Sequence, residues 1–406
     1  QKLVSPENID SETEDNFVFL GLVGIVDPPK DEAKQAIKQC LKSGLKPVMI
    51  TGDHPDTAFA IAKELKIAKH KNQVMTGSQL DNISVENLAK IIDNFSVFAR
   101  VSPEHKSKIV RAFKKQGKVV AMTGDGVNDA PSIAEANIGI CMGKSGTDVT
   151  KSVSDLVITD DDYSTIILAI KQGRTIYSNI QKIILFLLST NAVEVLGIFI
   201  SALVLRNAIF LLPSQILFIN LVTDSFPAFA LGMEKTEKNI MEKPPRNTKE
   251  NLFSGKIGTS ILYQSVVQTF IVLIVFVCAF HAYGNIVAST MIFIIICLMQ
   301  IIHSINCKTT NSIFSINIFN NRSFNLSFLG LLALILTVAF VPVLQTAFGI
   351  CALSLKQWLI VISASVSIVP LVEICKFFVN GYYKKHGENS FVQENQNIKV
   401  SNKTTI

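Results

Sequence analysis

Short apolar runs alternate with amphipathic segments in the first part of the chain, up to about residue 165. Apolar residues recur at helical spacing over 31–43, 56–65 and 103–115, which predicts helices there. Strand-like apolar runs lie at 17–26, 46–50, 96–100, 118–122, 138–142 and 155–159. Strands that alternate with helical patterns of about ten to fifteen residues indicate an α/β domain with a doubly wound parallel sheet, here at 17–165.

The pattern changes after residue 166, where the apolar stretches become long enough to cross a bilayer. A spanning helix needs ~20 predominantly apolar residues. Six stretches reach this length, at about 180–205, 211–231, 257–283, 286–305, 324–348 and 353–379. We therefore expect an all-α membrane domain of six transmembrane helices at 166–380, followed by a polar, disordered cytoplasmic tail at 381–406.

Composition supports a membrane protein. Of the 406 residues, 49% are hydrophobic and 17% are charged, against about 25% charged in soluble domains. The net charge of +6 is modest, and the sequence has no basic block interleaved with aromatic residues, so nucleic acid is not an expected partner. The seven cysteines form no CxxC pair and no metal-ligand spacing, which favours apolar packing roles.

The placement of lysine and arginine predicts the orientation in the membrane. The connection between the second and third stretches is rich in both, with Lys235, Lys238, Lys243, Arg246, Lys249 and Lys256. The connection at 281–288 has neither residue type. By the positive-inside rule, the α/β domain, the basic connection and the tail are expected on the cytoplasmic side of a multi-pass cell-membrane protein.

A polar string follows the strand predicted at 118–122. Asp125, Asn128 and Asp129 lie within five positions at its carboxyl end, where α/β sheets place their sites. Clustered carboxylates repel each other unless a cation neutralises them, and Mg²⁺ suits both carboxylates and phosphate. We expect Asp125 to hold Mg²⁺, and Asn128 and Asp129 to position a phosphate and a metal-bound water. The alternative interpretation is a polar turn.

The strand predicted at 46–50 ends in a second Thr-Gly-Asp, Thr51-Gly52-Asp53. A phosphoryl group needs hydrogen-bond donors for its oxygens and a cation for its charge. Thr51, the N–H of Gly52 and Lys106 are the candidate donors, and Asp53 is expected to face a nucleotide or a neighbouring loop. For Lys106, a solvated helix face remains an equal alternative.

Polar residues inside two apolar stretches form a second candidate site. Asn191 and Glu194 are spaced i, i+3, and Asn220, Thr223 and Asp224 are spaced i, i+3, i+4, so each set shares a helix face. Ionisable groups inside spans are expensive and usually functional. Oxygen-bearing side chains on two adjacent helices suit a hard cation. Hydrogen bonding between helices is the alternative, and it fits Asn191 better than the two acids.

Three further polar or helix-breaking residues lie in these stretches. Pro227 is expected to free backbone carbonyls in the second stretch. Gln300 and His303 share a face of the fourth stretch and are weighed as polar packing in preference to ion contact.

Together these strings resemble the P-type cation ATPases. The resemblance is carried by Asp27-Pro28-Pro29, Thr51-Gly52-Asp53, the string from Arg100 to Lys108 and the string from Thr123 to Pro131. The strings Asn191-Ala192-Val193-Glu194 and Asn220 to Ala228 look most like calcium pumps of the sarcoplasmic-reticulum and bacterial type. The resemblance covers about 17–379 and implies a haloacid-dehalogenase-like phosphorylation domain on a transporter.

The resemblance also implies roles for individual residues and cofactors. Asp125 and Asp129 would serve Mg²⁺, while Thr51, Gly52 and Asn128 would contact the phosphoryl group. The nucleotide or a phosphate of ATP would contact Asp53, Arg100 and Lys106. The transported ion, Ca²⁺, would bind Asn191, Glu194, Asn220, Thr223 and Asp224. Our own hypothesis is that protons return through Glu194 or Asp224.

Departures from the family pattern matter as well. The phosphorylated Asp-Lys-Thr-Gly-Thr string is absent, so we expect the carboxyl-terminal portion of a monomeric pump, with 1–16 as a remnant of the nucleotide-binding domain or linker. As given, the chain is expected neither to form a phosphoenzyme nor to transport. Cys297 stands where two-ion calcium pumps carry a glutamate, which suggests one Ca²⁺ per cycle.

Several alternatives to a calcium pump remain open. The transported cation could be Na⁺ or Mn²⁺, because oxygen ligands suit several hard cations. A membrane-anchored phosphatase domain is less favoured, because the nucleophile is absent and an anchor would not need carboxylates inside the membrane. The intact phosphate-site residues count against a non-catalytic membrane scaffold.

Overall fold

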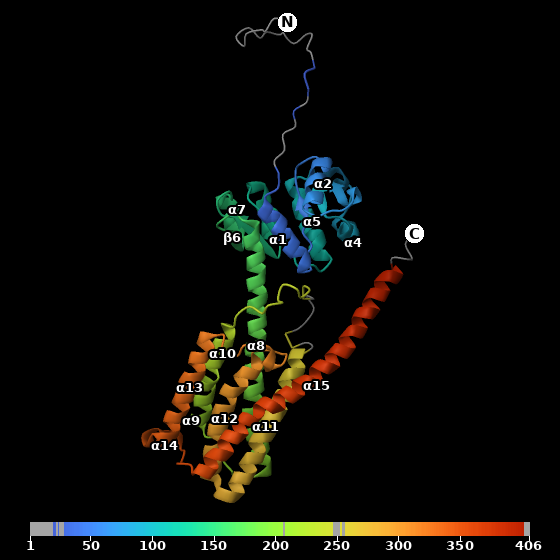
Figure 1. Ribbon diagram of the computed structural model, residues 1–406. Helices are drawn as coiled ribbons and strands as arrows, with labels where there is room; N and C mark the ends of the chain where they lie inside the picture. The colour runs from blue at the N-terminus through green and yellow to red at the C-terminus, as the bar shows by residue number, and fades with distance from the viewer. Residues whose placement is uncertain are drawn as a thin grey trace. The chain divides into compact units, whose positions relative to one another are not determined.

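The computed structural model describes residues 19–21, 23, 28–205, 208–246, 252–253 and 256–401, with side chains described as far as residue 385. The chain divides into two compact units (Figure 1). One comprises residues 1–41 and 46–164, and the other comprises 42–45 and 165–406. All of the described strands lie in the first unit, and the long apolar helices form the second.

Short parallel strands form two three-stranded sheets in the first unit. The strands are β1 (Met49–Ile50), β2 (Val74–Thr76), β3 (Val97–Ala99), β4 (Ala121–Gly124), β5 (Ile138–Met142) and β6 (Leu156–Ile158). Their order is β1-β3-β2 in one sheet and β4-β5-β6 in the other. The prediction of a parallel α/β domain is confirmed, with two sheets in place of one. β1 and β4 belong to different sheets and meet through side chains, since Ile50 and Met122 pack into one apolar cluster.

Helices connect these strands. They are α1 (Asp31–Lys42), α2 (Pro55–Glu64), α3 (Gly77–Asp81), α4 (Val85–Ile91), α5 (Pro103–Lys115), α6 (Ala130–Glu135) and α7 (Asp148–Val153), with 3₁₀ turns η3 (Lys71–Gln73), η4 (Ile92–Asn94) and η5 (Val127–Asp129). The three predicted helices are α1, α2 and α5. α5 begins where Ser102 accepts a hydrogen bond from the His105 N–H, a regular N-cap. The sequence analysis did not predict β2, which has too few apolar residues to be recognised. The strand predicted at 17–26 lies mostly outside the described residues, and Asp27 lies outside them as well.

Six helical segments of the second unit are long and apolar enough to cross a membrane, as predicted. The elements are α8 (Tyr163–Val204), α9 (Pro213–Phe218), the π-turn η6 (Ile219–Thr223), α10 (Ser225–Gly232), α11 (Lys256–Tyr283), α12 (Asn285–Cys307), η7 (Ile313–Ser315), α13 (Arg322–Phe340), α14 (Pro342–Phe348) and α15 (Leu355–Ser401). α9, η6 and α10 form one span. This part of the chain is a multi-pass membrane protein.

Two of these helices end elsewhere than predicted. The fifth span stops at Phe340, because Pro342 has no N–H to continue the helix and instead starts α14. The sixth, α15, runs past Val379 to Ser401, into the segment predicted as a disordered tail from 381, and no proline follows Pro370 to stop it.

α12 is the centre of the membrane unit. Its residues are buried almost without interruption from Ala288 to Cys307, and it packs against α11, α13, α15 and η6 (Figure 1). A helix that is apolar on all sides belongs in the interior of a bundle. Polar groups on α12 are therefore held away from lipid, among neighbouring helices.

Candidate functional site

The Thr-Gly-Asp loop after β1 is tied to the end of β3. The Thr51 hydroxyl donates to Asp53 Oδ2 at 2.8 Å, and the N–H groups of Arg100 and Val101 donate to the carbonyls of Asp53 and Thr51 at 3.1 and 3.3 Å. Arg100 reaches this position with a φ of 51°, which is uncommon for a residue other than glycine. Gly52 and Asp53 remain exposed. The loop is held by its backbone while the Gly52 N–H side stays accessible.

Lys106 and Asp129 form an ion pair at the second loop. Lys106 Nζ lies 2.5 Å from Asp129 Oδ1, and the side chains are 20% and 11% exposed. The Gly126 N–H also donates to Asp129 Oδ2, at 3.4 Å. Gly124 makes this arrangement possible, because a Cβ at that position would lie 2.5 Å from Asp129 Cβ. Both residues were predicted at the phosphate and metal site, and the structure pairs them with each other.

Asp125 and Asn128 differ from Asp129 in being exposed. The Asp125 backbone carbonyl accepts hydrogen bonds from the Thr147 N–H at 3.0 Å and from the Thr150 hydroxyl at 3.3 Å. Among the described residues, no hydrogen bond or ion pair engages the Asp125 carboxylate. The loop is thus fixed through its main chain, and both carboxylate oxygens stay available to a cation.

The segment after β5 supports this loop. The N–H groups of Lys144 and Ser145 donate to the Asp161 carboxylate at 2.9 and 2.8 Å, and these hydrogen bonds hold the pKa of Asp161 below its ordinary value. Thr147, two residues further on, makes the hydrogen bond to Asp125. Sequence reasoning gave Asp161 no role, because its partners lie sixteen and seventeen positions away.

The residues that precede the two Thr-Gly-Asp loops pack into the same apolar cluster. Ile50 immediately precedes Thr51, Met122 immediately precedes Thr123, and both side chains pack with Val110 of α5. The same helix carries Lys106. This packing supports the prediction that the two loops and Lys106 belong to one site.

A polar cluster is buried among the membrane helices. Glu194 of α8 accepts hydrogen bonds from Asn220 Nδ2 at 3.1 Å and from Gln300 Nε2 at 3.3 Å. The Thr223 hydroxyl donates to Gln300 Oε1 at 2.7 Å. Glu194, Thr223 and Gln300 are at most 4% exposed. Three helical segments, α8, η6 and α12, therefore contribute to one hydrogen-bonded group.

Asp224 lies beside this group with no cationic partner among the described residues. It is 2% exposed, and neither buried carboxylate oxygen accepts a hydrogen bond of regular geometry from a described residue. The Thr190 side chain lies close by, but its hydroxyl donates to the Phe186 and Leu187 carbonyls of its own helix. The side chain is close enough to Glu194 for the two carboxylates to repel. An unpaired buried charge costs several kcal/mol by order of magnitude. A cation or protons must therefore accompany this pair of acids.

The backbone is irregular at this position. Residues Ile219–Thr223 form a π-turn, and the Asp224 N–H reaches back five residues to the Ile219 carbonyl at 3.0 Å. π-turns inside α-helices occur frequently at functional sites. Pro227 has no N–H for the Thr223 carbonyl, so the freed-carbonyl prediction is consistent with this geometry.

The remaining predicted residues differ in their placement. Asn191 is half-buried, and no described side chain forms a hydrogen bond with it, so the structure does not join it to the cluster. Gln300 was weighed as packing, but it contacts both Glu194 and Thr223. His303 does pack, 3.1 Å from Ser189 Oγ and 3.4 Å from Cys307 Sγ.

Cys297 stands one turn before Gln300 on α12. It is fully buried and interacts with Thr223. Among the described residues, no group of three or more His, Cys, Asp or Glu side chains is placed to hold a metal ion. An ion at this cluster would thus depend on amide and hydroxyl oxygens in addition to two carboxylates.

Comparison with known proteins follows the same division of the chain. Residues 2–137 match the family model of haloacid dehalogenase-like hydrolases, and residues 208–378 match the model described as cation transporting ATPase, C-terminus. The chain is 44% identical over 390 residues to calcium-transporting ATPase 1 of Bacillus cereus, covering 91% of this chain and 44% of that protein.

Over most of its length, the chain is similar to cation-transporting ATPases. It is also 43% identical to a calcium-transporting ATPase of Bacillus subtilis, covering 87% of this chain and 40% of that protein. Identity to the human calcium-transporting ATPase type 2C member 1 is 37%, covering 89% of this chain and 39% of that protein. The chain spans less than half the length of these curated relatives. The α/β unit carries most of the match to haloacid dehalogenase-like hydrolases.

Proposed function

We propose that this chain is part of an ATP-driven pump that moves Ca²⁺ across the cell membrane through an aspartyl-phosphate cycle. The observation that carries the proposal is Asp224, a buried carboxylate that has no cationic partner among the described residues and lies beside Glu194 in a cluster of amide and hydroxyl oxygens. The names of the relatives favour Ca²⁺ among hard cations. The pump would act as a monomer, in one polypeptide with the segments of the relatives that lie outside this match.

The first unit would serve the phosphoryl group. Thr51, the Gly52 N–H and Asn128 are proposed to bind phosphate oxygens, and Asp53 and Arg100 to meet ATP. Mg²⁺ fits the loop after β4, because the Asp125 carboxylate is exposed and uncommitted; when bound, it would neutralise phosphate charge. Asp129 would support that position once Lys106 turns from it to the phosphate.

The membrane unit would hold the transported ion. Glu194, Asn220, Thr223 and Asp224 supply oxygen ligands of the type that Ca²⁺ prefers, with Asn191 as a further proposed ligand. In the absence of Ca²⁺, protons on Glu194 or Asp224 would relieve the repulsion between the two acids. Counter-transport would follow if the acids take up protons on the side where Ca²⁺ leaves and release them on the side where Ca²⁺ binds.

We also propose one Ca²⁺ per cycle. The face of α12 beside Thr223 presents the thiol of Cys297 and the amide of Gln300, and neither adds negative charge. Two carboxylates balance one Ca²⁺. The check is the number of Ca²⁺ ions transported per ATP by the full-length protein in sealed vesicles; a value near two would contradict the proposal.

Transport by the full-length protein tests the ion assignment. In sealed vesicles, ATP-driven uptake of Ca²⁺ is compared with uptake of Na⁺ and of Mn²⁺. Asp224→Asn should abolish uptake. Ser201→Ala is the matched control, because Ser201 lies buried on α8 and, among the described residues, its hydroxyl bonds only to the Ile198 carbonyl of its own helix. Uptake of another ion would support a pump but contradict the assignment of Ca²⁺. ATP hydrolysis without uptake of any ion would contradict the proposed ion site in the membrane.

A further inference from the structure

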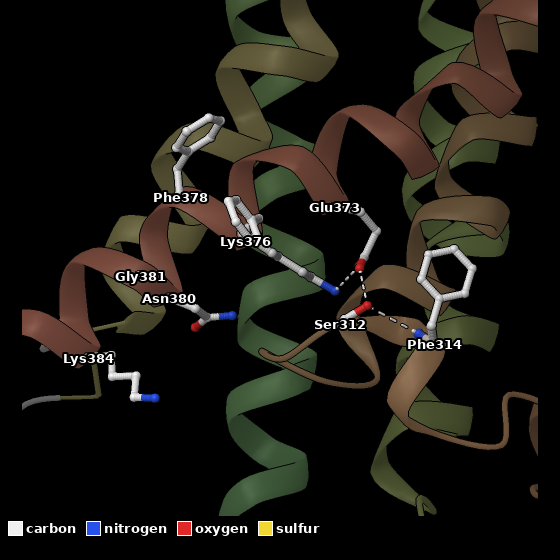
Figure 2. A pocket seen from close by; sticks show the side chains of 9 residues that line it. Ser312, Phe314, Glu373, Lys376, Phe378, Asn380, Gly381 and Lys384 are labelled. Carbon is white, nitrogen blue, oxygen red and sulfur yellow. Dashed lines mark hydrogen bonds and ion pairs between the residues drawn. The ribbon is translucent and has the colours of Figure 1, made fainter.

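A cavity of about 670 Å³ opens beside the end of the last span, away from both sites described above. It lies between the η7 segment and the part of α15 from Glu373 to Lys384 (Figure 2). Its lining is mainly apolar, and Phe314 and Phe377 are 83% and 76% exposed. In a protein that spans a bilayer, exposed aromatic surface of this kind is suited to contact with lipid.

The floor of the cavity is a self-contained ion pair. Lys376 Nζ lies 2.9 Å from Glu373 Oε1, and the Ser312 hydroxyl donates to Glu373 Oε2 at 2.6 Å (Figure 2). The Lys376 ammonium also donates to the Asn306 carbonyl at 2.9 Å. These contacts satisfy both charges, so the floor contributes shape and no net charge.

The rim, in contrast, carries positive charge that the described residues do not neutralise. Lys384 lines the cavity, and no described carboxylate lies within ion-pair distance of it. Lys256, at the start of α11, donates to Asn380 Oδ1 at 3.3 Å and stands 6.0 Å from the Tyr383 ring, also without a described carboxylate partner. Lys384 thus borders the apolar cavity, and Lys256 contacts Asn380, one of the residues that line it.

We propose that this cavity binds one anionic phospholipid. The lipid would come from the membrane leaflet in which the span formed by α15 ends, near Val379. The phosphate would sit between Lys384 and Lys256, and an acyl chain would lie along the phenylalanines. Tyr383 marks the same level, since tyrosine and tryptophan collect at membrane interfaces. The lysine-rich side of a membrane protein faces the leaflet that holds anionic lipids. The proposal is independent of the transported ion and of the pump cycle.

The apolar wall argues for a lipid rather than a free phosphate ion. A free phosphate ion would gain nothing from Phe314 and Phe377, whereas an acyl chain covers them. Gly381 gives a way to separate occupancy of the cavity from general attraction to charge. It lines the cavity, and a Cβ placed there would meet no atom within 4 Å, so Gly381→Leu should fold and fill the space without changing any charge.

The experiment measures lipid binding by the full-length protein purified in detergent. Mass spectrometry of the intact protein counts retained phosphatidylglycerol and phosphatidylcholine, and thermal unfolding is followed with each lipid added. We expect one retained phosphatidylglycerol and a higher Tm with that lipid. Lys384→Gln and Lys256→Gln should each weaken its binding by roughly five-fold. Lys385→Gln, the neighbouring lysine outside the cavity, is the matched control.

Gly381→Leu should abolish the retained phosphatidylglycerol although every lysine is present. Equal losses in Lys384→Gln and Lys385→Gln would overturn the proposal in favour of diffuse attraction. Unchanged binding in Gly381→Leu would overturn occupancy of the cavity. A Tm rise produced equally by inorganic phosphate without lipid would show a phosphate site and contradict the lipid.

Discussion

Two buried carboxylates, one in each unit, show how differently the same group can be accommodated. Asp129, in the α/β unit, is 8% exposed and is paired with Lys106 at 2.5 Å. Asp224, in the membrane unit, is 2% exposed, has no cationic partner among the described residues and faces Glu194. The first charge is balanced within the protein. The second needs something that the protein does not supply, which marks it as the place for an ion.

Removing the charge of Asp224 should separate ion binding from stability. Asp224→Asn keeps the shape and deletes the unpaired charge. We expect Ca²⁺ affinity to fall at least 100-fold, which corresponds to about 3 kcal/mol, and the ion-free protein to become more stable by about 1–3 kcal/mol. The measurements are Ca²⁺ binding at equilibrium and thermal unfolding in a chelator, both on the full-length protein.

The matched control for this change is Ser201→Ala, which should alter neither quantity. A loss of stability in the chelator would show that Asp224 is balanced within the protein after all. The comparison with Asp129 would then fail.

Breaking the pair in the α/β unit should have the opposite sign. Lys106→Met removes the cation and leaves Asp129 mostly buried and unpaired. Because both side chains keep some exposure, we expect a loss of about 2 kcal/mol rather than the larger cost of a fully buried charge. Thermal unfolding of the full chain measures it.

The double variant Lys106→Met/Asp129→Leu should recover most of this loss, since no charge is left unpaired. Lys108→Met on the same helix is not a suitable control, because Lys108 donates to the Leu80 carbonyl. Arg111→Met is better, since Arg111 forms a half-exposed pair with Glu135. Equal destabilisation by Lys106→Met and Arg111→Met would remove any special role for the Asp129 pair.

The sequence predicted the members of both sites better than their contacts. Spacing on one helix placed Asn220, Thr223 and Asp224 on a common face, and the structure keeps the last two buried. Gln300 was undervalued, because its contact with Glu194 depends on how α12 packs against α8, and no local pattern encodes that packing. The pairing of Lys106 with Asp129 was missed for the same reason, as 23 positions separate them.

Local backbone features were also unevenly predictable. Pro342 is visible in the sequence, and it could have predicted the break between α13 and α14. The π-turn at Ile219–Thr223 has no such signal, because it arises where the helix accommodates polar side chains against its neighbours. β2 depends on pairing with β3, from Val74 opposite Val97 to Thr76 opposite Ala99, and not on its own apolar content.

A third carboxylate, Glu237, provides an intermediate case outside the spans. It is partly exposed, pairs with Lys182 at 3.2 Å and with Lys243 at 2.7 Å, and accepts a hydrogen bond from Ser178 at 3.0 Å. Burial alone would raise its pKa, but the two lysines outweigh burial and lower the pKa of Glu237 to about 2. Because the folded pKa is depressed, this stabilisation is present above the ordinary glutamate pKa and disappears as pH falls towards 2.

We therefore expect residues 233–246 to loosen from α8 between about pH 4.5 and pH 2. Hydrogen exchange in that connection measures the change, compared with Glu237→Gln at neutral pH, which should mimic the acid form. Protection that is independent of pH in this range would contradict the assignment of the contact to charge.

The smallest effect on stability is expected at Asp125, which is exposed and uncommitted. Asp125→Asn should change the free energy of unfolding by less than about 0.5 kcal/mol, as for most surface substitutions. Binding of Mg²⁺ together with phosphate should nevertheless be lost, since the carboxylate is the proposed ligand. Thermal unfolding of the full-length protein, without ligand and with Mg²⁺ plus phosphate, separates the two effects.

Asp161→Asn should do the reverse. The Asp161 carboxylate accepts hydrogen bonds from the Lys144 and Ser145 N–H groups, so its loss should lower the free energy of unfolding while Mg²⁺ binding is weakened less. If the two variants behaved alike, the Asp125 carboxylate would be part of the fold, and the distinction between balanced and available carboxylates would not hold in this unit.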